Sequence, residues 1–112
     1  MTRKITIEAD PSKYKLALEG HVIAEEATAK QLIEGDYSPV LYFDTETLNM
    51  SIFERSDKVT HCPFKGDATH FHAVIDGQIY ENVAWMYENP IESAAGIKSH
   101  LAFYPIVASS LV

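Results

Sequence analysis

Residues 68–87 read ATHFHAVIDGQIYENVAWMY, and this stretch decides the fold class. Apolar and polar residues alternate on both sides of Asp76-Gly77, as they do in a β-strand with one buried face. Asp-Gly between two such runs is typical of a two-residue type I′ turn, which joins antiparallel strands. The stretch therefore predicts a β-hairpin.

A two-residue turn also fixes which residues of the hairpin face each other. Partners sum to a constant residue number, so Trp85 lies opposite Ala68 and Tyr87 lies opposite Gly66. Directly paired residues share one face of the sheet. Two large rings over two very small residues leave room either for packing from elsewhere in the protein or for a ligand.

Other segments predict more strands and few helices. Gly20 follows Glu19 between two apolar runs, which indicates a second tight turn. Residues 44–57 begin with Asp44 or Thr45 as a candidate N-cap, and in residues 89–100 a short helix or turn can follow Pro90, so each segment predicts a helical turn or two. The chain is expected to be mainly β, with about seven strands and one or two short helices. The strand runs are residues 5–9, 14–18, 21–26, 38–43, the two arms of the hairpin, and 101–112, while residues 27–35 fit helix or strand.

Length and charge limit the function classes. The chain has 112 residues, which suits one domain spanning 1–112. Its formal net charge of −7 argues against a nucleic-acid or anionic-membrane surface. It has no apolar run long enough for a membrane span and no signal-peptide pattern, so a cytoplasmic location is expected.

Reactive side chains gather in residues 60–72, THCPFKGDATHFH. The spacing of these histidines with the single cysteine does not match a structural zinc motif, so neither a metal nor another cofactor is expected. Cys62 is a candidate nucleophile, although a buried thiol that packs as a small hydrophobe is the simpler interpretation. Asp67 and His70 complete the set of candidate catalytic residues. Adjacent residues of a strand point in opposite directions, so His61 is poorly placed as a base for Cys62.

Several separated segments resemble the domain-of-unknown-function family 427. They are GHVIAEE (20–26), SPVLYFDTETL (38–48), THCPFKGDATHFH (60–72), ENVAWMYENP (81–90) and HLAFYP (100–105). Members are small and mostly bacterial, and the resemblance implies a β-tent, in which two small antiparallel sheets splay apart. The family pattern falls on Cys62, Pro63, Phe64, Lys65, Gly66, Ala68, Trp85, Tyr87, Pro90, Phe103, Tyr104, Tyr42 and Phe43.

The resemblance implies no single activity. A nucleotidyltransferase label is sometimes attached to the family, but this chain has neither the Gly-Ser nor the Asp-x-Asp of that chemistry. A module that binds a small polar ligand or a modified group in an aromatic-lined cleft is the first hypothesis. An enzyme using Cys62 or a His/Asp pair and an interaction subunit, such as a homodimer joined by an edge strand, are the alternatives. The expected ligand-binding residues are Tyr42, Phe64, Lys65, Gly66, Trp85 and Tyr87, with Asp67 or His70 orienting the ligand.

Overall fold

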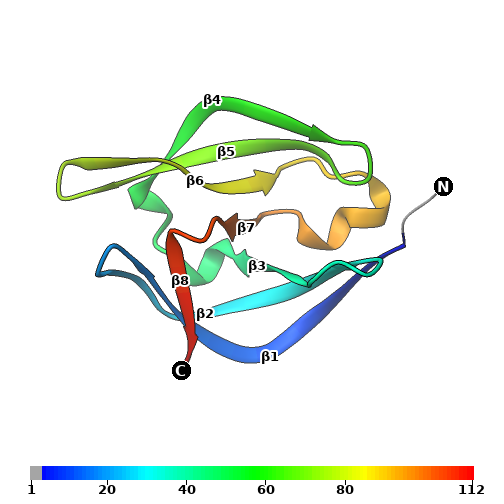
Figure 1. Ribbon diagram of the computed structural model, residues 1–112, viewed down its shortest axis with the longest axis horizontal. Coiled ribbons are helices and arrows are strands. Elements are labelled where there is room, and N and C mark those ends of the chain that lie inside the picture. Colours follow the sequence, from blue (N-terminus) through cyan, green and yellow to red (C-terminus); the bar gives the residue numbers. More distant parts are fainter. Residues whose placement is uncertain (1–3) are drawn as a thin grey trace.

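The computed structural model describes residues 4–112, and this part of the chain forms one open antiparallel sheet of eight strands (Figure 1). The order across the sheet is β4-β5-β6-β7-β3-β2-β1-β8. Three short 3-10 helices connect the strands. The elements are β1 (Ile5–Leu18), β2 (His21–Glu34), β3 (Val40–Asp44), η1 (Thr45–Thr47), η2 (Met50–Ile52), β4 (Phe53–Cys62), β5 (Gly66–Ile75), β6 (Gln78–Tyr87), η3 (Glu92–Ile97), β7 (His100–Phe103) and β8 (Val107–Leu111).

The mainly β class is confirmed, but the prediction of about seven strands in two sheets is wrong. One sheet forms because β7 pairs on both of its sides, with β6 through Ala84–Phe103 and its neighbours and with β3 at Phe43–Leu101 and Asp44–His100. Figure 1 shows β7 in the middle, between the β4–β6 strands above and the β1–β3 strands below.

The strand count differs at three places for local reasons. The runs 5–9 and 14–18 join into one strand, because a bulge between Ala9 and Lys13 takes up the polar residues and Ser12 N–H donates to Asp10 Oδ1 (2.8 Å). The final run divides at Pro105 into β7 and β8. Strand β4 was not predicted, because its exposed charged residues hide the alternation.

The predicted turns are confirmed. Glu19 and Gly20 have φ angles of 49° and 83°, and Asp76 and Gly77 have 51° and 79°. Two successive positive φ values are the mark of a type I′ turn. The helical turns also lie in the predicted segments, and Asp44 caps η1 by accepting a hydrogen bond from Glu46 N–H (3.0 Å). The ambiguous segment 27–35 is largely strand, within β2.

The register of the β5–β6 hairpin is as predicted only next to the turn. The pairs run from Ile75–Gln78 to Ala73–Tyr80 and then jump to Phe71–Ala84, so β6 carries two more residues than β5 at this point. The predicted pairs Ala68–Trp85 and Gly66–Tyr87 are therefore wrong, as are His70–Val83 and His72–Glu81, which follow from the same constant sum. Ala68 lies opposite Tyr87, and His70 lies opposite Trp85. A shift by two keeps the same residues on the same face.

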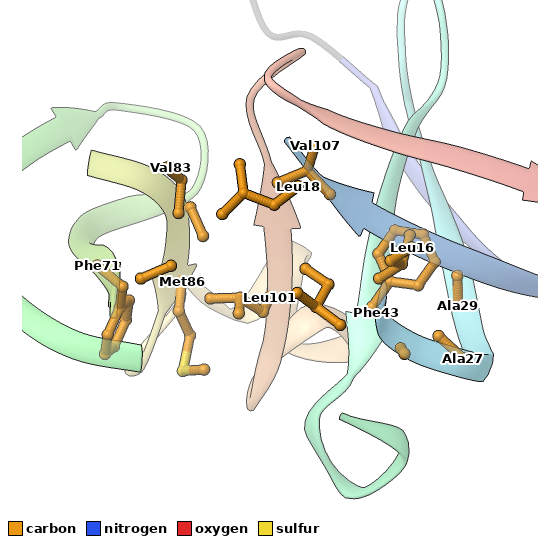
Figure 2. Close-up of a cluster of buried hydrophobic side chains, with 14 residues drawn as sticks. Leu16, Leu18, Ala27, Ala29, Phe43, Phe71, Val83, Met86, Leu101 and Val107 are labelled. Atoms are coloured by element: carbon orange, nitrogen blue, oxygen red, sulfur yellow. The ribbon is translucent and has the colours of Figure 1, made fainter. Parts of the chain in front are cut away.

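The core forms two clusters on opposite faces of the sheet, because neighbouring residues of a strand point to opposite sides. Leu101 of β7 belongs to the larger cluster, which Figure 2 shows, and the adjacent Ala102 belongs to the smaller one. The smaller cluster also holds Tyr42, Tyr87 and the η3 residues Ala94 and Ile97. Helix η3 thus covers part of this second face of the sheet with Ala94 and Ile97. No helix among residues 4–112 is long and apolar enough to cross a membrane.

Candidate functional site

A hollow of about 220 Å³, named here the polar hollow, opens beside the smaller core cluster. Its walls come from strands on both sides of β7. Strand β3 lies on one side, and β4, the β4–β5 turn, β5 and β6 lie on the other. The residue that follows β7 completes the wall. The lining residues are Val40, Tyr42, Thr60, Lys65, His70, Trp85, Tyr87 and Tyr104.

The hollow exists because two strands part. Strand β7 pairs with β3 only at Phe43 and Asp44, whereas its pairing with β6 continues to Phe103. The β3 residues Val40 and Tyr42 therefore pair with β2 alone. The hollow therefore lies where β3 and β7 part, within a single sheet and not between two.

A buried ion pair lies at one end of the polar hollow. Lys65 Nζ donates to Glu34 Oε1 at 2.8 Å, and the two side chains are 12% and 10% exposed. Burial alone would lower the pKa of Lys65, but hydrogen bonds to Glu34 and Cys62 outweigh it and the pKa is raised. Lys65 Nζ also lies 6.0 Å from the centroid of the Tyr87 ring, within reach of a cation–π contact. The ammonium of Lys65 is thus charged and already has an anionic partner.

His70 is buried and only half satisfied. It is 1% exposed, and its Nε2 lies 2.9 Å from Thr60 Oγ1. Its Nδ1 is buried without a hydrogen-bond partner among residues 4–112. Burial, and secondarily the positive charge of Lys58, lower the pKa of His70, so its imidazole is neutral at pH 7.

Aromatic rings form most of the remaining wall. Trp85 and Tyr104 have ring centroids 4.6 Å apart, and Tyr104 stacks on His70 at 6.0 Å with an interplanar angle of 17°. Tyr42 stands edge-on to Trp85 at 6.3 Å and accepts a hydrogen bond from its indole N–H (3.4 Å). Burial raises the pKa of the Tyr42 and Tyr87 phenols, so both are neutral at pH 7.

Five residues singled out from the sequence meet in this hollow. Four of them, Tyr42, Lys65, Trp85 and Tyr87, were expected to bind a ligand, and His70 was a candidate catalytic residue.

The other candidates lie outside the walls of the polar hollow. Phe64 lies in the β4–β5 turn, and Cys62 is half-buried and packs against the smaller core cluster. Gly66 and Asp67 instead line a separate hollow with His61, Thr69, Glu88, Asn89 and Ile91. Asp67 Oδ1 there lies 2.7 Å from His61 Nδ1, in an exposed pair. The candidate catalytic residues Cys62, Asp67 and His70 therefore do not form one cluster.

Within residues 4–112 no three His, Cys, Asp or Glu side chains are placed to hold a metal ion together.

Sequence reasoning missed Glu34, Thr60 and Tyr104 as parts of the site. Glu34 is 31 residues from Lys65 in the chain, and no local pattern marks it as buried. Tyr104 could have been found from the Phe-Tyr of the family pattern, in which it lies next to Phe103.

A family model described as a domain of unknown function (DUF427) matches residues 6–111. A comparison with curated proteins gives no match. The family match covers essentially the whole sheet, including every residue of the polar hollow.

Proposed function

The chain belongs to the DUF427 family, whose description assigns no activity, and we propose that it binds a small uncharged polar ligand in the polar hollow. The single observation that carries this proposal is the state of His70. Its Nδ1 is a buried polar atom with no partner among residues 4–112, in a side chain that lines the hollow. Buried polar atoms are almost always hydrogen-bonded, so a ligand that pairs with this nitrogen, once the His70 ring turns to expose it to the hollow, would remove a large penalty.

The charges around the hollow favour a ligand without net charge. The positive charge of Lys65 is matched by Glu34 at 2.8 Å, and the phenols of Tyr42 and Tyr87 are neutral. A charged ligand would lose its hydration and meet no unpaired opposite charge. An uncharged amide or hydroxyl group can still exchange hydrogen bonds with the imidazole and the phenols.

The same geometry supports an enzyme less well. Thr60 Oγ1 and His70 Nε2 lie within hydrogen-bond distance, as a hydroxyl nucleophile and its base would. A base of this kind needs a partner on its other nitrogen to stabilise the imidazolium, and Nδ1 of His70 has none among the described residues. The lowered pKa of His70 works in the same direction, because it makes the imidazole a weaker base.

Binding can be followed through Trp85, the only tryptophan of the chain, which lies in the wall. We expect propionamide to change the Trp85 emission in a saturable way, and propionate and propylammonium to bind at least about tenfold more weakly, since neither finds a free counter-charge. Tyr104→Ala should weaken propionamide binding about twofold to tenfold through lost ring contacts. Ile106→Ala, an exposed change in the same turn and outside the hollow, is the matched control.

Two results would overturn the proposal. One is that none of the three probes perturbs Trp85. The other is that Tyr104→Ala and Ile106→Ala bind propionamide as the parent protein does.

A second candidate, an interaction subunit that pairs with its own copy, is favoured by the β8 edge. Lys13 O accepts a hydrogen bond from Val112 N–H, and in an antiparallel pair every second residue bonds to the same neighbour. The backbone N–H and C=O groups of Ser109 and Leu111 therefore point away from β1. Strand β8 has no charged residue and Leu111 is 69% exposed, whereas the opposite edge strand β4 is guarded by charges. Two copies of β8 could pair antiparallel about Ser110.

Sedimentation at micromolar concentration tests this second candidate. A dimer that Leu111→Lys dissociates without loss of fold would support it, and a parent protein that sediments as a monomer throughout would exclude it.

A further inference from the structure

The edge of β7 that faces β3 is only partly used. Tyr104, which continues the register of β7, donates its N–H to Val83 O of β6 (2.9 Å), and successive residues of an antiparallel strand point their backbone groups alternately to its two neighbours. The N–H and C=O groups of Leu101 and Phe103 therefore point away from β6, toward β3. Leu101 pairs there with Phe43, whereas Phe103 has no strand partner on this side among residues 4–112.

The edge of β3 that faces β7 is free in the same way. The backbone groups of Phe43 point to β7, so those of Leu41 and Pro39 point to the same side. Leu41 and Phe103 would form the next pair between the two strands, but this pair does not form. The space between these edges, named here the strand gap, thus receives the N–H and C=O groups of Leu41 and Phe103 and the C=O group of Pro39.

A hollow of about 350 Å³ lies in the strand gap, on the side of the larger core cluster. Leu41 and Phe103 line it from the two edges. Among the described residues that line this hollow none is charged, and only Ser109 and Trp85 have a polar side-chain atom. The other polar atoms of its lining therefore belong to the backbone.

The strand gap lacks the charges that usually protect a free strand edge. The outer edge strand β4 carries Glu54, Arg55, Asp57 and Lys58, whereas the strand gap has only Pro39 as a residue that discourages pairing. Backbone donors and acceptors that alternate along a strand edge are complementary to the main chain of an extended peptide. The strand gap therefore fits an added strand.

We propose that the strand gap is a docking site for an extended, uncharged segment of another protein, which enters between β3 and β7 and pairs with both edges. Because β3 and β7 run antiparallel, the segment is antiparallel to one of them and parallel to the other. Every second side chain of the segment enters the hollow, and the uncharged lining favours an apolar residue there. This docking does not depend on a ligand in the polar hollow.

Amide hydrogen exchange measured by NMR tests the free edges directly. In the protein alone, the N–H groups of Leu41 and Phe103 should exchange at least about tenfold faster than those of Tyr42 and Ala102, which point to β2 and β6. The probe is acetyl-TVTVT-amide, an uncharged peptide in which threonine and valine alternate. It should slow exchange at Leu41 and Phe103 and leave Tyr42 and Ala102 unchanged.

Two altered peptides separate main-chain pairing from other contacts. N-methylation of two successive central residues removes one N–H toward each edge, and it should weaken binding about tenfold or more. Acetyl-TDTDT-amide should also bind at least about tenfold more weakly, because its carboxylates would lose hydration in a hollow without charged groups. Titration of the Leu41 and Phe103 amide signals gives the dissociation constants.

A pair of variants at one position tests the same contact from the protein side. Leu41→Pro removes an N–H that faces the strand gap and none that faces β2, so it should weaken binding of acetyl-TVTVT-amide about fivefold or more. Leu41→Ala shortens the same side chain and keeps the N–H, so its binding should stay within about threefold of the parent. If Leu41→Pro does not fold, the N-methylated peptide still decides.

Four results would overturn the proposal. The first is that the amides of Leu41 and Phe103 in the free monomer are as protected as their neighbours. The second is that acetyl-TVTVT-amide at about 5 mM shifts neither amide signal. The third is that the N-methylated peptide binds as tightly as its parent. The fourth is a dimer in which both amides are protected without peptide, because a second copy would then fill the strand gap.

Discussion

At the scale of single residues, the buried Lys65–Glu34 pair is expected to have a large effect on stability. Both side chains are nearly buried, and removing one partner of a buried pair leaves a charge that has lost its compensation. Lys65→Met should lower the free energy of unfolding by about 3 kcal/mol, measured by urea denaturation at neutral pH.

The matched control is the double variant Lys65→Met, Glu34→Gln, which removes both charges. It should recover a large part of the loss, because no buried carboxylate is left without its ammonium. Equal losses in the single and the double variant would show that the pair contributes through packing alone.

Gly66 is required by its backbone and not by the ring of Tyr87. Its φ angle is +113°, and an added Cβ would lie 3.4 Å from the carbonyl oxygen of Asn89. Gly66→Ala should cost about 1–3 kcal/mol, because this region of φ is open essentially to glycine alone.

Gly35→Ala is the control for Gly66→Ala. Gly35 also has a positive φ (+55°), but an added Cβ there meets nothing within 4 Å. Its cost should be smaller, about 1 kcal/mol. Thermal denaturation that ranks Gly35→Ala as the more damaging change would contradict this account.

At the scale of elements, the bulge in β6 depends on Asn82. This residue has a φ of 48°, and its backbone N–H donates to His72 Nδ1 at 3.0 Å. Asparagine tolerates this conformation, whereas a β-branched residue does not. Asn82→Val should therefore lower the free energy of unfolding by about 1–3 kcal/mol, and Asn82→Gly should stay within about 0.5 kcal/mol of the parent. Chemical denaturation that finds both variants equally destabilised would argue against backbone strain as the cause.

Strand β4 is tied to the end of β6 by Arg55 and Glu88, whose two hydrogen bonds measure 2.6 and 2.8 Å. The hydrogen bond from Arg55 is the main reason that the pKa of Glu88 falls to about 2. A carboxyl group with a lowered folded-state pKa contributes stability that is present above its ordinary pKa of 4.5 and is lost as the pH falls through about 2. The side chains are 60% and 37% exposed, so solvent screening limits the contribution to about 0.5–1 kcal/mol.

Glu88→Gln tests this pH dependence. The variant should be less stable than the parent near neutral pH by that amount, and the difference should shrink below about pH 4.5 and vanish near pH 2. Urea titrations across this range measure it. A difference that is constant with pH would assign the effect to the hydrogen bond of Thr69 to Glu88 and not to the charge.

The predictable elements are those whose turns require particular residues. Glu19-Gly20 and Asp76-Gly77 have the residues that a type I′ turn needs, and both hairpins formed where expected. The bulge at Asn82 was not predictable, because one asparagine in an alternating run marks no register change. Strand β4 was missed because an exposed edge strand carries charges for protection, and charge hides a period of two.

At the scale of the whole molecule, the site could be predicted only where one segment contains it. Trp85 was found from the predicted hairpin, although opposite the wrong partner, and His70 and Lys65 were found because both lie in the reactive segment 60–72. Glu34 could not be found, since its contact with Lys65 depends on the order of strands across the entire sheet. The order was not predictable because the short β7, with four residues, decides it by pairing on both sides.

The two parts of the sheet are held together by β7, and Leu101 is the side chain that joins their cores. It is fully buried, it pairs with Phe43 on one side and Met86 on the other, and Figure 2 shows it between Phe71 and Met86 and the group around Leu16 and Phe43. Because both parts pack on the same residue, we expect the protein to unfold as a single cooperative unit.

Leu101→Ala should therefore destabilise the whole sheet by about 2–5 kcal/mol, through the lost transfer free energy and the cavity that it leaves. Amide signals from β2 and from β5, followed by NMR during denaturation, should lose intensity in one transition with the change in Trp85 fluorescence. Val59→Ala, on the exposed edge of β4, should stay within about 0.5 kcal/mol of the parent. If β5 and β6 melt before β1 and β2 in Leu101→Ala, the two parts are separate folding units, and the opening at the polar hollow lies on the boundary between them.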